Sequence, residues 1–445
     1  MSLTESSSTG QSRRKIKDMI AVNFGNALEW YDWNIYTIFA VVFASQIFKA
    51  GNPTSALLST LAVFAVGFIA RPIGGFIFGA VADKLGRKRS LFIAMMVTAA
   101  GSLIIAVTPT YAAAGILAPI VLTVARLLQG LAHGGEMGTS VTYLVERAPD
   151  NRRGFFGATS WISVVIGTIL ATLVGLGINA FLTPYQVASW GWRLAFALGG
   201  LLGLYALVLR RSIEESEHYA ATKEIRKVTR PSTGKGDVPE SSKLSILRGL
   251  WIIFVVSASG SLMFYTWLIY LPTHAQQVHQ LPPTQTLSAS LIAQVIFMAA
   301  IFGAGVLGDR IGRKPMVIFF SLLFVILPYP LFGILGSSFF SFLAVQTVAL
   351  LGVAVLFGVN GALWSEVLPT EVRAKGVATV LSLATAIFGG TAPYVITWLS
   401  ANGLPNVFPG YLMAMAALTG VTTIFMKETK GVSLSKVTEA TGRAQ

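Results

Sequence analysis

The sequence predicts an all-α membrane protein in which twelve transmembrane helices form two pseudo-symmetric six-helix bundles. Hydrophobic residues make up 54% of the 445 residues and charged residues only 12%, about half the share of a typical soluble protein. The apolar runs are about 20 residues or longer, the length needed to cross roughly 30 Å of hydrocarbon. One short motif also occurs twice, as Gly-Ala-Val-Ala-Asp-Lys-Leu-Gly-Arg-Lys at 79–88 and as Gly-Val-Leu-Gly-Asp-Arg-Ile-Gly-Arg-Lys at 305–314.

Each copy of the motif lies between two apolar runs, so it occupies a short, charged turn between two spanning helices. A second set of residues recurs at the same spacing, as Glu146, Pro149 and Arg153 and again as Glu366, Pro369 and Arg373. Two similar halves of a polytopic membrane protein are typical of transporters in which one half rocks against the other. We therefore expect alternating access.

The spanning helices are expected at 19–48, 56–82, 90–108, 114–145, 154–182, 191–210, 248–272, 286–308, 315–335, 338–365, 375–400 and 406–427. The predicted organisation is an N-terminal tail (1–18), a six-helix bundle (19–210), a polar linker (211–247), a second six-helix bundle (248–427) and a C-terminal tail (428–445). The N-terminus lacks a cleavage site after a short apolar core, so we expect a retained tail and not a signal peptide.

Basic residues orient these helices. They gather in the turns after the even-numbered helices, namely Lys84, Arg87, Lys88, Arg89, Arg147, Arg152, Arg153, Arg310, Arg313, Lys314, Arg373 and Lys375. Lys and Arg stay on the cytoplasmic side, so both termini and the linker are expected in the cytoplasm, as an even number of spans requires. The net charge of +14 is explained by these turns and the linker, with attraction to anionic lipid as a consequence.

Other functional classes find little support. We see no aromatic and basic module that would read nucleic acid, so no nucleic-acid partner is expected. The chain has no cysteine, and its four histidines, at 133, 218, 274 and 279, make no metal-ligand pattern. No nucleophile and base pair is recognisable, so neither catalytic residues nor a metal site are predicted, and the chain is not expected to be an enzyme.

Ionisable residues within spanning helices are costly and indicate function. They lie in the first half, as Glu29, Asp32, Arg71, Arg126, His133 and Glu136. From the rise per residue, Asp32 lies roughly 20 Å above the cytoplasmic start of its helix, and Arg126 roughly 18 Å below the outer end of the fourth. Asp32 is therefore expected to meet Arg126 or His133, and Glu29 to lie level with Glu136. Gln129, His133, Glu136 and Ser140 form one polar stripe.

These residues suggest roles, each with a structural alternative. Arg126 is the best candidate to hold a substrate carboxylate, because a guanidinium stays charged and binds through two parallel hydrogen bonds; an ion pair with Asp32 is the alternative. Arg71 is expected to assist, or to be structural. Asp32 is the candidate proton carrier. His133 is a candidate for proton coupling or a packing residue.

The remaining candidates are weaker. Glu29 and Glu136 either take part in proton coupling or pair structurally with Arg71 or the turn arginines. In the second half, Tyr265, Trp267 and Asn360 are candidates to close the substrate cavity, although such residues often only pack. We expect the two motif turns to act as cytoplasmic gates, with Asp83 at the end of a neighbouring helix; their residues are Gly79, Asp83, Gly86, Arg87, Lys88, Asp309, Gly312, Arg313 and Lys314.

The duplicated turn resembles that of the major facilitator superfamily, over essentially the whole chain. Within it, Gly25–Asp32, Arg71–Gly75, Gln129–Glu136 and Trp190–Arg193 resemble the metabolite:proton symporters. Arg126 is similar to the organic-acid carriers of that family, and 260–266 and 386–392 to its 2-oxoglutarate permeases. His133 departs from that pattern, which usually has a small apolar residue there.

The resemblance implies a transporter of a bacterial cytoplasmic (inner) membrane. It would import a small organic anion with a proton, most simply a dicarboxylate such as 2-oxoglutarate, as a monomer and without a cofactor other than the proton. Symport of a zwitterion such as proline or betaine, symport of shikimate, and proton-coupled efflux by antiport remain the alternatives.

Overall fold

The computed structural model describes residues 5–49, 51–134, 145, 148–149, 151–210 and 240–432, and these residues contain helices and no strands. The first half contains α1 (Glu5–Ile47), α2 (Pro53–Leu85), α3 (Arg87–Val107), α4 (Tyr111–Ala114), α5 (Leu117–His133), α7 (Arg153–Phe181), α8 (Pro184–Gln186), η1 (Val187–Gly191) and α9 (Trp192–Arg210). The second half contains α11 (Glu240–Phe264), η2 (Tyr265–Tyr270), α12 (Leu271–Val278), α13 (Pro283–Ile311), α14 (Arg313–Ile326), α15 (Pro328–Ile334), α16 (Phe339–Glu366), α17 (Thr370–Ala384), η3 (Thr385–Gly389), α18 (Ala392–Ala401) and α19 (Val407–Ile424).

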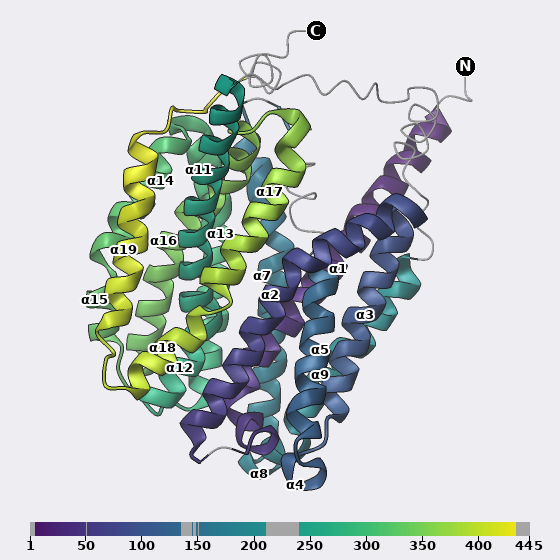
Figure 1. Cartoon of the computed structure of the whole chain (residues 1–445), viewed down its shortest axis with the longest axis vertical. Helices are drawn as coiled ribbons and strands as arrows, with labels where there is room; N and C mark the ends of the chain where they lie inside the picture. The colour runs from purple at the N-terminus through teal and green to yellow at the C-terminus, as the bar shows by residue number, and fades with distance from the viewer. Residues whose placement is uncertain are drawn as a thin grey trace.

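The helices form two groups that stand side by side (Figure 1). Helices α1–α9 make one group and α11–α19 the other, and α7 packs against α13 and α16 between them. Among the described residues, nine helical segments are long and apolar enough to span a membrane, and α14 with α15, bent by 49°, makes a tenth. Helices α1 and α5 occupy the two remaining predicted positions, so the structure is consistent with twelve spans.

Some boundaries differ from those predicted. Helix α1 begins at Glu5, within the expected tail, because the helix continues through the polar residues before the membrane. The predicted helix at 114–145 begins instead as the separate short helix α4, since Gly115 has a φ of 57° and interrupts it. Most of the predicted linker, at 211–239, lies outside the described residues, as does most of the predicted C-terminal tail.

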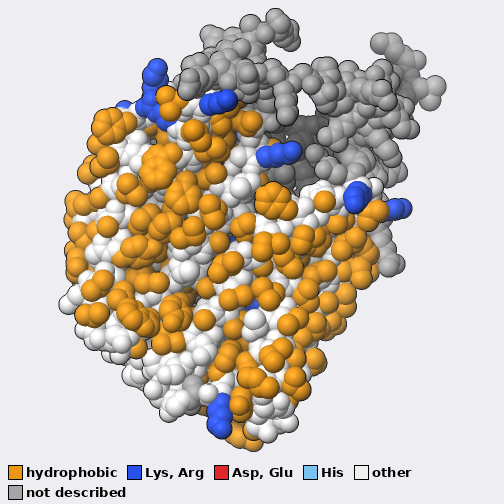
Figure 2. All heavy atoms as spheres, viewed as in Figure 1, with side chains coloured by type: hydrophobic (Ala, Val, Ile, Leu, Met, Phe, Trp, Pro, Cys, Tyr) orange, Lys and Arg blue, Asp and Glu red, His pale blue; other side chains and the backbone are white. Residues whose placement is uncertain are grey.

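The outer surface is apolar (Figure 2). Hydrophobic side chains cover the helices on the face shown, and the Lys and Arg side chains visible there lie mostly near the end that carries the termini. Large side chains are exposed along the helices; Phe76, Phe319 and Phe340 are 72%, 52% and 77% exposed. Such a surface is costly in water and is matched by lipid. The protein is therefore a multi-pass membrane protein.

The duplicated motif forms equivalent turns in the two halves. Helix α2 ends at Gly86 with a φ of 92°, and α13 ends at Gly312 with a φ of 111°. Non-glycine residues rarely adopt this left-handed region, which explains why both copies carry glycine there. In each half the chain turns directly into the next helix, α3 or α14, so the predicted pseudo-symmetry holds at these turns.

Close packing of α2 against α5 fixes the helices that carry the two membrane arginines. A side chain at Gly74 would place its Cβ 1.9 Å from the carbonyl oxygen of Leu131, and one at Gly130 2.0 Å from that of Gly67. Small residues let spanning helices approach this closely. Arg71 and Arg126 therefore project from two helices whose spacing is set by glycine.

Candidate functional site

Asp32 belongs to a chain of hydrogen bonds that connects α1, α3 and α5. Its Oδ2 accepts a hydrogen bond from the Ser102 hydroxyl at 2.6 Å, and the Ser102 oxygen accepts one from Nε2 of Gln129 at 2.8 Å. Oε1 of Gln129 accepts a hydrogen bond from Nη1 of Arg126 at 2.8 Å. All four side chains are buried. The predicted meeting of Asp32 and Arg126 therefore takes place through two polar side chains and not as a direct ion pair.

The two membrane arginines share one indole ring. The Arg126 guanidinium lies 3.7 Å from the centre of the Tyr36 ring and 4.6 Å from that of Trp33. The Arg71 guanidinium lies 4.2 Å from the Trp33 ring and 3.9 Å from that of Phe68. Cation–π contacts contribute about 0.5–1 kcal/mol at exposed sites and about 2 kcal/mol or more when desolvated, as these two guanidinium groups are. Aromatic rings therefore hold both cations in a buried position without using their hydrogen-bond donors.

Both guanidinium groups keep the same edge unpaired. Nε and Nη2 of Arg71 and of Arg126 are buried and have no hydrogen-bond partner within the part of the chain that the structure describes. Together Nε and Nη2 form an edge that can grip a carboxylate through two parallel hydrogen bonds. Leaving buried donors without partners is costly. The geometry is thus suited to a ligand with two anionic groups.

Glu29 and His133 form a second buried polar pair. Oε2 of Glu29 contacts Nδ1 of His133, whose ring lies 6.1 Å from that of Trp30. Of the two partners expected for Asp32, Arg126 is the one to which hydrogen bonds connect it, and His133 contacts Glu29 instead. His133 is seven residues beyond Arg126 along α5, which brings it nearer to Glu29, one turn earlier on α1. Glu136, predicted to lie level with Glu29, falls outside the described residues.

Tyr265 reaches this region from the second half. It begins the π-helical segment η2, and its ring lies 6.2 Å from Trp30 and 5.0 Å from Phe68, the ring that Arg71 also contacts. The indole of Trp267 packs against Phe332 at 5.0 Å within the second half, and its role in closing the cavity stays a prediction. Two residues along a helix place their side chains on roughly opposite faces, which turns Trp267 away from Tyr265.

Asn360 lies between the halves, and its side chain is hydrogen-bonded to a side chain of the first half. Its Oδ1 accepts a hydrogen bond from Nε1 of Trp161 at 3.1 Å. Trp161 also packs 4.2 Å from the Phe357 ring. A small pocket adjoins these residues, lined by Trp30, Trp161, Ser261, Phe264, Tyr265, Phe357, Leu381 and Thr385. Asn360 is therefore placed to respond to movement between the halves.

The second copy of the motif links the two halves at the ends of α7 and α13. Asp309 accepts hydrogen bonds from the backbone N–H groups of Gly154 at 2.7 Å and Phe155 at 2.9 Å, in the first turn of α7. A carboxylate is stabilised at a helix N-terminus by the helix dipole. Arg313 pairs with Asp309 at 3.1 Å and with Glu366 at 2.9 Å. This is the helix-end position that the sequence predicted for Asp83.

The other motif residues are described in part. Gly79 lies within α2, and Gly86 and Gly312 form the turns. Nζ of Lys314 donates a hydrogen bond to the carbonyl oxygen of Ile424 at 2.7 Å, so this residue holds α19 against α14. The side chains of Asp83, Arg87 and Lys88 lie outside the described residues.

Sequence reasoning missed Ser102 and Trp161 and gave no site role to Gln129 or Trp33. Helix α3 also carries the hydroxyl groups of Ser90 and Thr98, and no pattern marks Ser102 among them as the donor to Asp32. Gln129 belongs to the polar stripe of α5, and this pattern is the sequence signal that could have identified it as a site residue. Trp33 follows Asp32 directly in α1, and its ring contacts the guanidinium groups of both arginines.

Two similar halves and a buried, charged centre between the helices of a multi-pass membrane protein are typical of a transporter. The chain belongs to the sugar (and other) transporter family, whose profile matches residues 19–440.

Curated relatives extend over nearly the whole chain. The alpha-ketoglutarate permease of Escherichia coli (strain K12) is 34% identical over 436 residues, which cover 96% of this chain and 97% of that protein. The citrate-proton symporter of Klebsiella pneumoniae is 32% identical over 430 residues, 94% of each chain. A putative proline/betaine transporter of Staphylococcus aureus (strain COL) is 31% identical over 452 residues, 95% of this chain and 91% of that protein. The predicted resemblance to metabolite symporters is confirmed, and these relatives are transporters and not enzymes.

Solved structures share the fold. The major facilitator superfamily proton:xylose symporter XylE bound to 6-bromo-6-deoxy-D-glucose has a TM-score of 0.73 at 19% identity, covering 96% of this chain and 98% of that one. The inward-open conformation of XylE from E. coli has a TM-score of 0.72 at 20% identity, covering 96% and 99%. The predicted fold class is therefore confirmed.

Proposed function

We propose that this protein is a proton-coupled symporter that imports an organic acid, namely a dicarboxylate such as 2-oxoglutarate, by alternating access. The observation that carries the proposal is the pair of unpaired Nε and Nη2 edges on Arg71 and Arg126, both stacked on Trp33. One carboxylate on each edge would satisfy four buried donors. A ligand with a single carboxylate would leave one edge unpaired, and a neutral ligand would leave both.

The relatives support the substrate class. Two of them carry the names of an alpha-ketoglutarate permease and a citrate-proton symporter, and both substrates named there are polycarboxylic acids. The putative proline/betaine transporter favours a zwitterion as the second candidate. Competition between a labelled dicarboxylate and excess betaine separates the two.

Coupling follows from electrostatics in the proposed mechanism. Arg126 reaches Asp32 through Gln129 and Ser102, so its positive charge is shared between that carboxylate and any bound anion. A substrate carboxylate at Arg126 weakens the compensation of Asp32, and a proton on Asp32 removes its negative charge. Proton and anion therefore stabilise each other's binding, and by linkage the effect is reciprocal.

We further propose that both termini face the cytoplasm of a bacterial cell whose inner membrane holds the protein. The two six-helix halves would rock as domains about the contact between α7, α13 and α16. The link from Asp309 to the start of α7 and its counterpart at Asp83 would act as cytoplasmic gates. Neither a cofactor other than the proton nor a second copy of the chain is required by this scheme.

Proteoliposomes that contain the purified protein and a pH-sensitive dye test the proposal. We would add 2-oxoglutarate, citrate, shikimate and betaine separately and record internal pH. Acidification with 2-oxoglutarate or citrate is expected. A response to betaine alone would replace the dicarboxylate by a zwitterion, and alkalinisation would indicate antiport. No response to any of the four would contradict the proposed function.

A further inference from the structure

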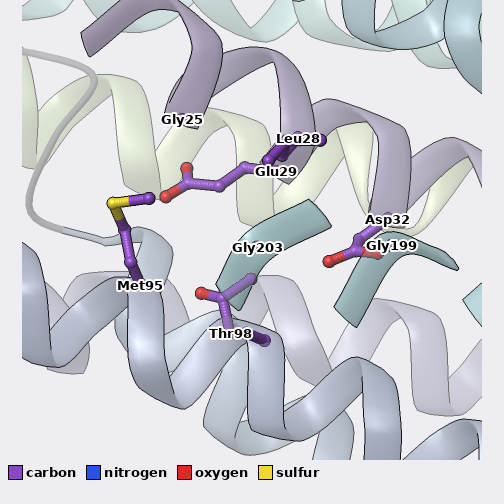
Figure 3. Close-up of a pocket in the computed structure, with 9 residues that line it drawn as sticks. Gly25, Leu28, Glu29, Asp32, Met95, Thr98, Gly199 and Gly203 are labelled. Atoms are coloured by element: carbon purple, nitrogen blue, oxygen red, sulfur yellow. The ribbon is translucent and has the colours of Figure 1, made fainter. Parts of the chain in front are cut away.

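A small pocket lies within the first half, on the side of α1 that faces α3 and α9. It is lined by Gly25, Leu28, Glu29, Asp32, Met95, Thr98, Ala99, Gly199 and Gly203 (Figure 3). The aromatic rings that hold the two arginines form no part of this lining. The pocket is therefore distinct from the proposed substrate site, to which Asp32 is connected through Ser102, Gln129 and Arg126.

One oxygen of Asp32 borders this pocket without a partner. Oδ2 accepts the Ser102 hydroxyl, but Oδ1 is buried and has no hydrogen-bond partner in the described part of the chain. Oδ1 faces Gly199, where an added Cβ would lie 2.4 Å away, and Figure 3 shows the carboxylate beside this glycine. A buried carboxylate oxygen needs a hydrogen-bond donor. A water molecule in the pocket next to Oδ1 could be that donor.

The size of the pocket agrees with water and excludes an organic substrate. Its volume, measured for the centre of a water-sized molecule, is about 20 Å³. One water needs about 10–15 Å³ by this measure, so the pocket takes one or two molecules. The glycines keep it open: an added Cβ at Gly203 would lie 2.9 Å from the Cβ of Ala99.

The lining residues are ordered along the membrane axis. Helices α1 and α3 run away from the end that carries the termini, and α9 runs back toward it. Glu29 precedes Asp32, Met95 precedes Thr98, and Gly203 follows Gly199. On all three helices, the pocket therefore extends from Asp32 toward the side of the termini.

We propose that this pocket is a water site through which Asp32 releases its proton toward the termini, separately from the substrate. The inference rests on the proposed role of Asp32 in proton coupling. The O–H bond on Oδ1 breaks and its electron pair stays on the carboxylate, while the proton forms a new bond to the pocket water. That water passes a proton to the carboxylate of Glu29 or to solvent.

The charged groups around the pocket favour proton transfer from Asp32 toward Glu29. Asp32 faces Arg126, Tyr31 and the negative charge of Glu29. Glu29 contacts His133 and lies within the field of Arg71. A second carboxylate at the far side of the water attracts a proton as it leaves the first. The substrate, by contrast, would lie against the arginines and the rings of Trp33 and Tyr36, which form no part of the pocket lining.

Substitutions that dry or fill the pocket test the inference without altering Asp32. Thr98→Val keeps the side-chain shape and removes the hydroxyl, and Ala99→Val adds two methyl groups next to Gly203. Thr123→Val is the matched control for Thr98→Val, because each threonine hydroxyl donates a hydrogen bond to the carbonyl oxygen four residues earlier. Ala100→Val is the control for Ala99→Val, because Ala100 is exposed. We expect Ala99→Val to slow 2-oxoglutarate-driven acidification at least about tenfold.

Exchange of labelled for unlabelled 2-oxoglutarate distinguishes this effect from misfolding. Exchange does not require proton release, so the pocket variants should exchange at the wild-type rate. Wild-type acidification in both pocket variants would overturn the inference. Equal loss of exchange and acidification would also overturn it, since the pocket would then be structural. Absence of acidification in the wild type would instead contradict the proposed function.

Hydroxyl-radical footprinting with X-rays supplies a readout independent of transport. Radicals formed from bound water oxidise adjacent methionines. Met95 and Met415 are similarly buried, with 5% and 8% exposed, but only Met95 lines the pocket. We expect Met95 to be labelled severalfold faster than Met415, and Ala99→Val to remove the difference. Equal labelling in the wild type would show that the pocket is dry and contradict the inference.

Discussion

Replacing Arg71 or Arg126 by lysine tests the two-carboxylate site most directly. Each arginine offers the buried Nε and Nη2 edge to a ligand, and lysine keeps the positive charge but offers a single point contact. The substitution removes at least one charge-assisted hydrogen bond, worth about 1.5–3 kcal/mol. Because 1.4 kcal/mol corresponds to a tenfold change in Kd, each variant should bind 2-oxoglutarate about 10- to 100-fold more weakly.

The measurement is isothermal titration of purified protein in detergent with 2-oxoglutarate. Arg193→Lys is a matched control, because Arg193 also stacks on an indole, 4.2 Å from the Trp192 ring, but donates to the carbonyl oxygen of Thr108 at 2.6 Å. Its replacement should leave the Kd unchanged. A monocarboxylate such as pyruvate occupies one edge only, so one of the two site variants should bind it as well as the wild type.

Two results would refute this reasoning. If both lysine variants bind 2-oxoglutarate within threefold of the wild type, the unpaired edges do not hold carboxylates. If Arg193→Lys weakens binding as much as the site variants do, the loss reflects general damage to the fold.

Three further predictions concern Asp32, Ser102 and Asp309. Asp32→Asn should lower uphill accumulation in energised vesicles at least about tenfold and preserve exchange, since the amide cannot carry the coupled proton; full accumulation would contradict its role. Ser102→Ala removes the donor to Asp32 and should lower the accumulation ratio, whereas Ser102→Thr should retain it; equal ratios would exclude a role for this hydroxyl. Asp309→Asn weakens the hydrogen bonds from the backbone N–H groups of Gly154 and Phe155. It should lower the free energy of unfolding in detergent by about 1–3 kcal/mol. An unchanged melting curve would show that the contact between Asp309 and the start of α7 does not stabilise the protein.

The fold and the polar centre could largely be predicted from sequence because each has a one-dimensional signal. Spanning helices follow from run length, and the turns at Gly86 and Gly312 follow from a motif whose glycines need positive φ. Depth along a helix is set by residue number, which is why Asp32 and Arg126 could be placed near each other. Rotation about the helix axis is also regular, so it argues against a shared site for Tyr265 and Trp267.

What could not be predicted depends on contacts between helices. Nothing along α3 distinguishes Ser102 from a packing serine, since its role depends on where α1 and α5 place Asp32 and Gln129. The pairing of His133 with Glu29 likewise depends on how α1 crosses α5. Helix crossings follow from side-chain packing over the whole bundle, and a single sequence carries no local record of them.

Charge balance in the buried centre explains why coupling would be obligatory in the proposed mechanism. Without substrate, Arg126 compensates Asp32 through Gln129 and Ser102. A dicarboxylate that binds both arginines brings two negative charges against two positive ones, which leaves an ionised Asp32 without compensation. Leaving a buried group without compensation costs about 1–3 kcal/mol, and more when the group is charged. In the proposed mechanism a complex with substrate but no proton would therefore be the minor species, so the substrate would cross the membrane together with a proton.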